Sequence, residues 1–328
     1  MSKNLSQQVV LDRRGFVAAT FATVAGLGLA GCSDTSAEAD KGSAAGSSKG
    51  SEDTEVSATL DAKAFDKLVD NGPKADDDAI AASTWATAVK DAGVFKIGGV
   101  QTSTLFSLLN EKDGQTRGFD AGIAQLLSNY ILGENKVEIT QVTSDTRESV
   151  LQNDQVDAVF ATYSITEDRK KLISFAGPYF VTGQGLLVGA DSDIKSVDDL
   201  SAETTVCSAT GSTPIQNIKT NYPDVPTKEY DTYSKCVEDL KNGQVDAVTT
   251  DEAILIGYAA QDPDKLKVVG EPFSEERYGI GLAKGDDALV EYFNTQLTDG
   301  AKIWQQIFDN NLGASGVKAT QPEVDPIG

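Results

Sequence analysis

Residues 151–159 read LQNDQVDAV and residues 240–248 read LKNGQVDAV, with seven of nine positions identical at an offset of 89 residues. Each copy is typical of a helix end, a turn and a buried strand. Two copies indicate two similar lobes, whose first strands we expect at Val94–Val100 and Thr204–Ala209. Because this unit is common, chance similarity is the alternative explanation.

The sequence around the first copy alternates short apolar runs with helical patterns. We predict helices over Phe119–Leu132 and Arg147–Gln152, and strands over Val137–Val142 and Val156–Ala161. This alternation predicts an α/β fold with largely parallel strands.

The ends of the two repeated strands predict where a ligand would bind. Ligands of open α/β sheets lie beyond the carboxyl ends of the strands. Thr162 and Asp251 follow the two strands at equivalent positions. Two lobes that face each other would therefore place a hydroxyl group and a carboxylate on opposite walls of one cleft.

The chain is strongly acidic, with 50 Asp and Glu residues against 28 Lys and Arg and a formal net charge of −22. Such a surface repels nucleic acid and anionic lipid, so we expect neither as a partner. The sequence has no histidine, which excludes Ser-His-Asp and Cys-His nucleophiles and most histidine-based metal sites. We expect no catalytic residue, no metal and no cofactor.

Residues 1–31 are typical of an export signal. Arg13 and Arg14 precede an apolar stretch over 16–30 that is too short and too weakly apolar for a membrane span. The paired arginines resemble a twin-arginine signal, and the choice between the Tat and Sec routes stays open. Residues 29–32 read LAGC and resemble a bacterial lipobox, which implies that Cys32 is lipidated. An ordinary signal peptide with an incidental cysteine is the alternative.

The segment that follows Cys32, up to residue 57, consists almost entirely of small, polar and charged residues. Such a segment cannot bury a core, so we expect a disordered linker. The other two cysteines, Cys207 and Cys236, form an even pair in an oxidising compartment, which indicates a disulfide. That bond would close a loop of about 30 residues and contribute about 3.6 kcal/mol on the chain-entropy model. Two buried free thiols are the alternative.

Five motifs together resemble the polar amino-acid-binding proteins of ABC importers, solute-binding family 3. They are GFD at 118–120, FATYSITEDR at 160–169, FAGPYF at 175–180, DAVTTD at 246–251 and YGIG at 278–281. The resemblance covers residues 93–313. Phe160–Thr166 and the cysteine pair are most similar to the glutamate-binding lipoprotein branch of that family.

The resemblance implies a two-lobed, type II periplasmic-binding-protein-like fold with a cleft between the lobes. Two crossover hinge strands are expected near Val181–Leu187 and Phe273–Ile280, and a helix around Ile303–Phe308 would complete the first lobe. The expected order of segments is an N-terminal extension over 58–92, lobe 1 over 93–186, lobe 2 over 187–276, a return to lobe 1 over 277–313 and a tail over 314–328.

A bound amino acid presents an ammonium and a carboxylate, and each needs a partner once it is desolvated. The resemblance implies that Arg169 holds the α-carboxylate, for which its forked guanidinium is suited. A surface ion pair with Glu167 or Asp168 is the alternative. Asp251 would accept from the ammonium, although it could also cap the helix that follows it.

Two further groups match ligand-contacting positions of the family. Thr162, through its carbonyl, and Ser164, through its hydroxyl, lie two residues apart on an extended segment and can both face the cleft. The turn Gly211, Ser212 and Thr213 opens a helix, whose free N–H groups can bind an anion. Plain helix capping is the alternative for this turn.

Arg147 is the residue on which the choice of ligand depends. Acidic amino-acid binders of the family carry an arginine here that meets the side-chain carboxylate, which implies an acidic ligand, with glutamate favoured over aspartate and glutamine. A solvated arginine paired with Asp145 or Glu148 is the alternative. Gln101, at the end of the first strand, is a further candidate for the pocket wall.

The function that we expect is ligand binding without covalent chemistry. The chain would be a monomer, anchored by lipid to the outer face of the cell membrane, that delivers its amino acid to the membrane subunits of an ABC importer. An amino-acid-sensing lipoprotein is one alternative. A lyase or dehydratase on the same fold is another, but it would need a proton donor or base besides Asp251.

Overall fold

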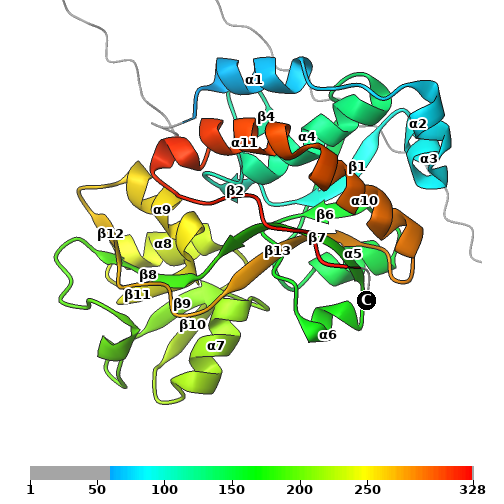
Figure 1. Cartoon of the computed structure of the whole chain (residues 1–328). Coiled ribbons are helices and arrows are strands. Elements are labelled where there is room, and N and C mark those ends of the chain that lie inside the picture. The colour runs from blue at the N-terminus through cyan, green and yellow to red at the C-terminus, as the bar shows by residue number, and fades with distance from the viewer. Residues whose placement is uncertain (1–59, 327–328) are drawn as a thin grey trace, which may run out of the picture. The chain divides into compact units, whose positions relative to one another are not determined.

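The computed structural model describes residues 60–326 (Figure 1). The predicted export signal, Cys32 and the linker lie outside these residues. Within the described part of the chain, every helix is too short or too polar to cross a membrane.

The first sheet has the strand order β5-β1-β6-β13-β7. Its strands are β1 (Phe95–Gly99), β5 (Val137–Gln141), β6 (Ala158–Phe160), β7 (Ser174–Thr182) and β13 (Glu276–Leu282). Strand β1 runs parallel to β5 and β6, whereas β13 is antiparallel to both β6 and β7. The predicted strands near residues 94, 137 and 156 are therefore confirmed as neighbours in one sheet.

Three helices of this lobe were predicted. They are α4 (Phe119–Leu132), α5 (Arg147–Gln152) and α11 (Ala301–Asn310), which contains the segment expected around Ile303–Phe308. Helices α6 (Glu167–Lys170) and α10 (Asp287–Asp299) were not predicted. Helix α4 ends at Gly133, which takes the left-handed conformation with φ 79°. Helix α11 packs against α4, and its Trp304 donates a hydrogen bond of 2.7 Å to the carbonyl of Tyr179 on β7.

The second sheet has the order β10-β9-β11-β8-β12. Its strands are β8 (Gln184–Gly189), β9 (Val206–Ala209), β10 (Thr227–Tyr230), β11 (Ala247–Asp251) and β12 (Leu266–Val269). Strand β9 is parallel to β10 and β11, and β8 is antiparallel to β11 and β12. Each sheet thus holds a parallel group of three strands, and the two-lobed α/β prediction is confirmed.

The helices of the second lobe complete the repeated unit. They are α7 (Thr213–Asn221), α8 (Tyr233–Lys241) and α9 (Glu252–Gln261). Helices α5 and α8 end in the repeat, and strands β6 and β11 follow them. The turns contain Asp154 with φ 52° and Gly243 with φ 66° at equivalent positions. The turn requires a left-handed backbone at this position. Aspartate and glycine both tolerate that conformation, so either residue can occupy the position.

The chain passes between the sheets twice. It leaves the first sheet at Gly183, between β7 and β8, and it returns between β12 and β13. The two crossings touch, since a Cβ atom at Gly183 would lie 2.4 Å from the carbonyl oxygen of Ser274. Only glycine allows this approach. The exact segment boundaries given above stay predictions.

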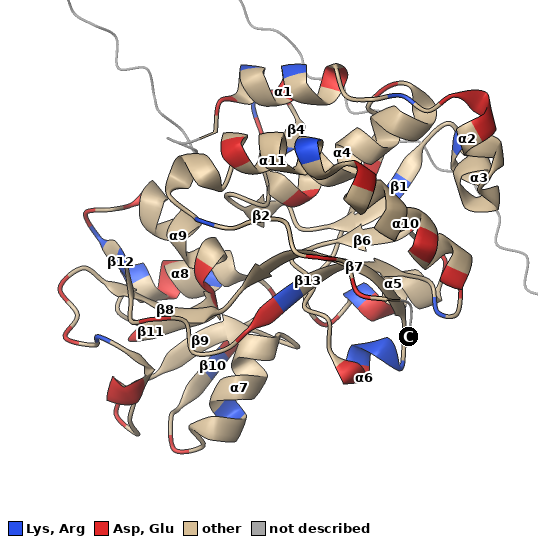
Figure 2. Cartoon of the chain, viewed as in Figure 1, with Lys and Arg blue, Asp and Glu red and all other residues tan. Residues whose placement is uncertain are grey.

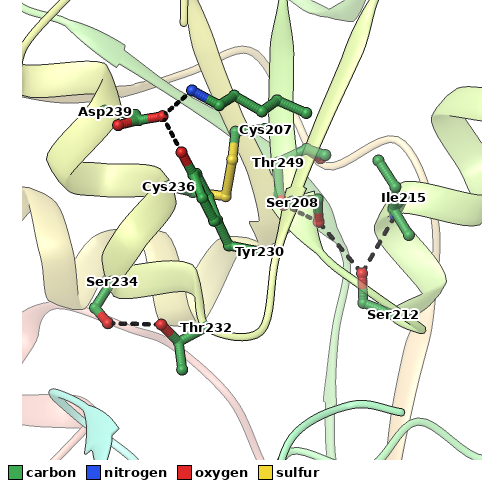
Figure 3. Close-up of a disulfide and its surroundings, with 11 residues drawn as sticks. Cys207, Ser208, Ser212, Ile215, Tyr230, Thr232, Ser234, Cys236, Asp239 and Thr249 are labelled. Atoms are coloured by element: carbon green, nitrogen blue, oxygen red, sulfur yellow. Dashed lines mark hydrogen bonds and ion pairs between the residues drawn. A yellow bond between two sulfur atoms is a disulfide. The ribbon is translucent and has the colours of Figure 1, made fainter. Parts of the chain in front are cut away.

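The predicted disulfide between Cys207 and Cys236 is confirmed, and it joins β9 to α8 with their Cα atoms 5.5 Å apart (Figure 3). Both residues belong to the second lobe. Beside the bond, Asp239 of α8 accepts a hydrogen bond of 2.8 Å from the hydroxyl of Tyr230 on β10. Helix α8 is therefore fixed to the sheet at two points.

Several further elements were not predicted. They are α1 (Ala62–Asp70), α2 (Asp77–Ala81) and α3 (Thr84–Ala92), and a small sheet of β2 (Thr102–Ser103), β3 (Ser107–Asn110) and β4 (Gln115–Arg117). Figure 1 shows α1 lying beside α4 and α11, which it contacts. Arg117 of β4 fixes α1 by two ion contacts of 2.7 and 2.8 Å with Asp66. The extension therefore packs on the first lobe.

The C-terminal tail runs back to the crossing strands after a short 3₁₀ turn, η2 (Gly313–Ser315). The backbone N–H of Asp325 donates to the carbonyl of Gly177 on β7 at 2.7 Å. Its carboxylate accepts from Arg277 on β13, also at 2.7 Å. The tail is thereby tied to both strands that lead into and out of the crossings.

Candidate functional site

Loops at the carboxyl ends of the two sheets meet around a cavity of about 30 Å³. Arg147, Thr162 and Asp120 line it from the first lobe, and Thr232 and Tyr233 line it from the second. The predicted residues Arg147 and Thr162 therefore share this cavity. The other predicted ligand residues of the two lobes do not line it, and all of them except Ser212 and Gln101 take part in hydrogen bonds between the lobes. They are Ser164, Arg169, Gly211, Thr213 and Asp251.

Arg169 connects the two lobes. Its Nη1 donates to the carbonyl of Ser164 at 2.8 Å, and its Nη2 donates to the carbonyl of Gly211 at 3.1 Å. Its Nε lies 3.6 Å from the carboxylate of Glu148, whereas Glu167 and Asp168 pair with neighbouring lysines. Burial, helped by the charge of Arg147, lowers the Arg169 pKa to about 10, so it stays cationic at neutral pH.

Arg147 begins α5 and is buried, with 4% of its surface exposed. Its Nη1 donates to the carbonyl of Ala161 at 2.9 Å, and its Nη2 donates to that of Ser144 at 3.3 Å. The guanidinium lies 4.0 Å from the ring centroid of Tyr163. Its Nε has no hydrogen-bond partner within residues 60–326. The solvated ion pair considered above is not what the structure shows.

Thr162 takes a left-handed backbone conformation, with φ 44°. Its N–H donates to Asp120 Oδ2 at 2.7 Å, and the hydroxyl of Tyr179 donates to Asp120 Oδ1 at 2.8 Å. Complete burial raises the pKa of Asp120 to about 7. No role for Asp120 was predicted from the sequence, although an acid at the start of an apolar helix was a signal for one.

Asp251 ends β11 and precedes α9, but its side chain makes no capping hydrogen bond to that helix. Its Oδ2 accepts from the hydroxyl of Tyr278 on β13, and its Oδ1 has no partner in the described part of the chain. Burial, with a contribution from the charge of Glu276, raises the pKa of Asp251 well above its ordinary value. The carboxyl group is thus available to a cation.

The turn before α7 performs two tasks. Ser212 Oγ accepts from the N–H of Ile215 at 3.4 Å, which is the capping role considered as the alternative (Figure 3). Gly211 has φ 75°, and a Cβ there would lie 2.8 Å from the Cβ of Asp145 in the other lobe. Glycine therefore permits both the turn and the close approach of the lobes.

Ser164 and Thr213 meet across the two lobes, with their hydroxyl oxygens 3.4 Å apart. Thr213 donates its own proton to Glu276 Oε2 at 3.0 Å. Glu276 also accepts from the amide of Gln184, whose oxygen accepts from Asn217 at 2.6 Å. This buried network was not predicted from the sequence, although Glu276 lies inside a predicted crossover strand.

Gln101 lies in a separate groove, away from the contacts described above. Its side chain donates to Thr116 Oγ1 at 3.2 Å, and it lines a separate groove with Leu109 and Tyr258. It does not line the small cavity of about 30 Å³.

The buried charged side chains differ in how far they are paired with an opposite charge. Figure 2 shows acidic and basic residues interspersed over the surface helices, with both signs on α6 and β13. Buried Arg117 is matched by two carboxylates, Asp66 and Asp113. Arg147 has no ion pair among the described residues, and Arg169 has only the contact of 3.6 Å. The site thus offers two cations to carboxylates, and Asp251 to an ammonium.

Comparisons with known proteins agree with this architecture. The family model of bacterial extracellular solute-binding proteins, family 3, matches residues 95–311. A glutamine-binding protein of Geobacillus stearothermophilus is 47% identical over 60% of this chain and 75% of its own length. The glutamate-binding protein GluB of Corynebacterium efficiens is 42% identical over 62% of this chain and 74% of its own.

A solved structure shows the same fold. An ancestral arginine-binding protein bound to glutamine superimposes with a TM-score of 0.62 and 36% identity, over 67% of this chain and 98% of its own length. The family resemblance inferred from the five motifs is therefore confirmed. The chain belongs to the bacterial extracellular solute-binding proteins, family 3.

Proposed function

We propose that this chain is the substrate-binding lipoprotein of an ABC importer for an acidic amino acid, with glutamate favoured over aspartate. The observation that carries the proposal is Arg147, which is buried beside the cavity and whose Nε has no partner within the described residues. A buried, unmatched guanidinium is costly unless an anion meets it. The side-chain carboxylate of glutamate is such an anion.

The remaining groups of the ligand find partners of the opposite charge. The α-carboxylate would bind the fork of Arg169 and the N–H groups of the turn at Gly211, Ser212 and Thr213. The ammonium would donate to Asp251, to the carbonyl of Thr162 and to the hydroxyl of Ser164. A cavity of about 30 Å³ is far smaller than the roughly 300–1,000 Å³ of ordinary ligand pockets. Binding therefore requires the lobes to part and close around the ligand.

The two binding proteins reported above, which are named for glutamine and glutamate, support an amino acid of this length. Glutamine is the second candidate, because its amide oxygen can accept from Arg147 Nε. A neutral amide would leave the positive charge of Arg147 uncompensated, which is why glutamate is favoured.

The N-terminal sequence supports the proposed location. The lipobox at 29–32 supports a lipid anchor at Cys32 on the outer face of the cell membrane, with the folded part acting as a monomer. The proposal contains no catalytic step. An amino-acid-sensing role would use the same site and the same anchor.

A thermal-shift screen of the proteinogenic amino acids tests the proposal, followed by calorimetric titration of those that stabilise the chain. Glutamate should give the largest shift, since a ligand at 100 times its Kd stabilises by about 2.7 kcal/mol. A larger shift with a neutral or basic amino acid would refute the glutamate assignment, and no shift with any of them would refute amino-acid binding.

A further inference from the structure

Glu276 is a buried acid to which the proposed function assigns no ligand contact. It is the first residue of β13, where the chain returns to the first sheet, and 5% of its surface is exposed. Its two oxygens accept hydrogen bonds from Gln184 and Thr213, which are both neutral. Within residues 60–326, Glu276 forms no ion pair.

Glu276 lies close to Asp251. Gln184, which holds Glu276, is the direct cross-strand partner of Asp251 in the pairing of β8 with β11. The charge of Glu276 contributes to the raised pKa of Asp251, after burial itself. Asp251 also lacks an ion pair among the described residues, and its Oδ1 lacks any hydrogen-bond partner there. Two neighbouring carboxyl groups are thus buried without a close ion pair among the described residues, and Arg147 and Arg169 act on Asp251 only at longer range.

The charged and titratable groups that face this pair come from four elements. They are Arg147 on α5, Arg169 on α6, Tyr233 on α8 and Tyr278 on β13. Both arginines direct their hydrogen bonds to backbone carbonyls, and Tyr278 is a neutral donor to Asp251. A buried carboxylate without a cation is expensive, and a second one beside it adds to the cost.

The hydroxyl groups of Thr213 and Ser164 lie next to the pair, and the hydrogen bonds that they form have a fixed donor and acceptor. Thr213 donates its proton to Glu276, so its oxygen can only accept on the side that faces Ser164. A ligand group that enters between Ser164, Thr213 and Asp251 therefore meets hydrogen-bond acceptors and two neighbouring acids. An ammonium supplies both the donors and the charge.

We propose that Glu276 is a second acid of the ligand site, which acts with Asp251 to make retention of the ligand depend on its ammonium group. This inference rests on the proposed function and assigns a specificity role to a residue of the crossing strand. An analogue without the amino group would leave both carboxylates buried and uncompensated, and closure around it would be disfavoured.

Calorimetric and displacement titrations of L-glutamate and glutarate test the inference, because glutarate keeps both carboxylates and lacks the amino group. The measured quantity is the Kd of glutarate divided by the Kd of L-glutamate. In E276Q this ratio should fall at least about tenfold, since one uncompensated buried charge is removed. A merely structural role would weaken both ligands alike and leave the ratio unchanged. E276M removes the charge with an apolar side chain of similar length, so one variant remains if the other fails to fold.

E275Q is the matched control, because Glu275 is the exposed neighbour of Glu276 and its substitution changes the net charge equally. Its ratio should match that of the wild type. An unchanged ratio in E276Q and E276M, or an equal fall in E275Q, overturns the inference while leaving the proposed function intact. If the wild type binds neither glutamate nor glutamine, the proposed function fails instead. If it binds glutamine, the same comparison uses glutamine and its analogue without the amino group.

Discussion

Replacement of Arg147 by alanine separates an acidic ligand from a neutral one. A hydrogen bond between charged groups contributes about 1.5–3 kcal/mol, which corresponds to about 10- to 150-fold in Kd. A neutral amide that accepts from the same Nε contributes about 0.5–1.5 kcal/mol, or about 2- to 12-fold. R147A should therefore weaken glutamate by at least about tenfold and glutamine by clearly less.

The structure shows why the ratio of the Kd values of glutamate and glutamine is more informative than the loss of affinity for either ligand alone. Arg147 also donates to the carbonyl of Ala161 and lies over the ring of Tyr163, so its removal loosens the loop that carries Thr162. That loosening affects every ligand equally and cancels in the ratio of the two Kd values. R147K is the matched variant: it keeps the charge but loses the fork, and its ratio should lie between those of the wild type and R147A.

Calorimetric titration of both ligands against wild type, R147A and R147K gives the result. R169A is the reference, because every amino acid carries the α-carboxylate and both ligands should be lost together. Equal losses of glutamate and glutamine in R147A, or no loss of glutamate, would refute the argument that Arg147 reads the side chain. The ligand would then be a polar amino acid of unassigned side chain.

Four further outcomes are expected. C32A should move the chain from the membrane fraction to the medium or leave it unprocessed; a mature membrane-bound C32A would contradict lipidation. Peptide mapping without reductant should recover Cys207 linked to Cys236, and reduction should lower the free energy of unfolding by at most about 3.6 kcal/mol; two alkylatable thiols would exclude the bond. G211A should weaken ligand binding without lowering the melting temperature of the unliganded chain by more than a few degrees, because the added Cβ obstructs lobe contact; unchanged affinity would show that the approach is not needed. Burial raises the Asp120 pKa to about 7, above its unfolded value of about 3.9, so the folded state binds the proton more tightly and the free energy of unfolding falls as pH rises between these values. Denaturant titrations at several pH values should show this fall in the wild type and a smaller fall in D120N. Parallel curves of the free energy of unfolding against pH would contradict this prediction.

The fold was readable from the sequence wherever local pattern and global packing agree. Helix α4 has an apolar pattern and ends at Gly133, so its limits could be predicted from both signals. The repeat located β6 and β11 because a buried strand follows each turn. Helices α1 and α3 were missed although they carry similar signals, since α1 buries Phe65 and Val69 on one face and the two helices begin at the capping residues Asp61 and Ser83.

Some residues of the candidate site could be predicted from the sequence, and others could not. Arg147 and Arg169 carry charges that must be explained if buried, so their residue types already pointed to a ligand. The roles of Asp120 and Glu276 depend on partners 42 and 63 residues away, Thr162 and Thr213, and no local pattern encodes such contacts. Gln101 was expected at the cavity because it follows β1, but it points to Thr116 of the small unpredicted sheet.

The path of the C-terminal tail matters for anyone who attaches something to this protein. Asp325 is held by Arg277 and Gly177, so the end of the described chain lies on the two strands that join the lobes. A reporter domain or surface linker fused after this point would pull directly on the pivot between the lobes. A sensor built from this chain would therefore couple mechanical load to ligand release when tethered by its C-terminus. Tethering through the N-terminal side, where we propose the lipid anchor, would not load the pivot through Asp325.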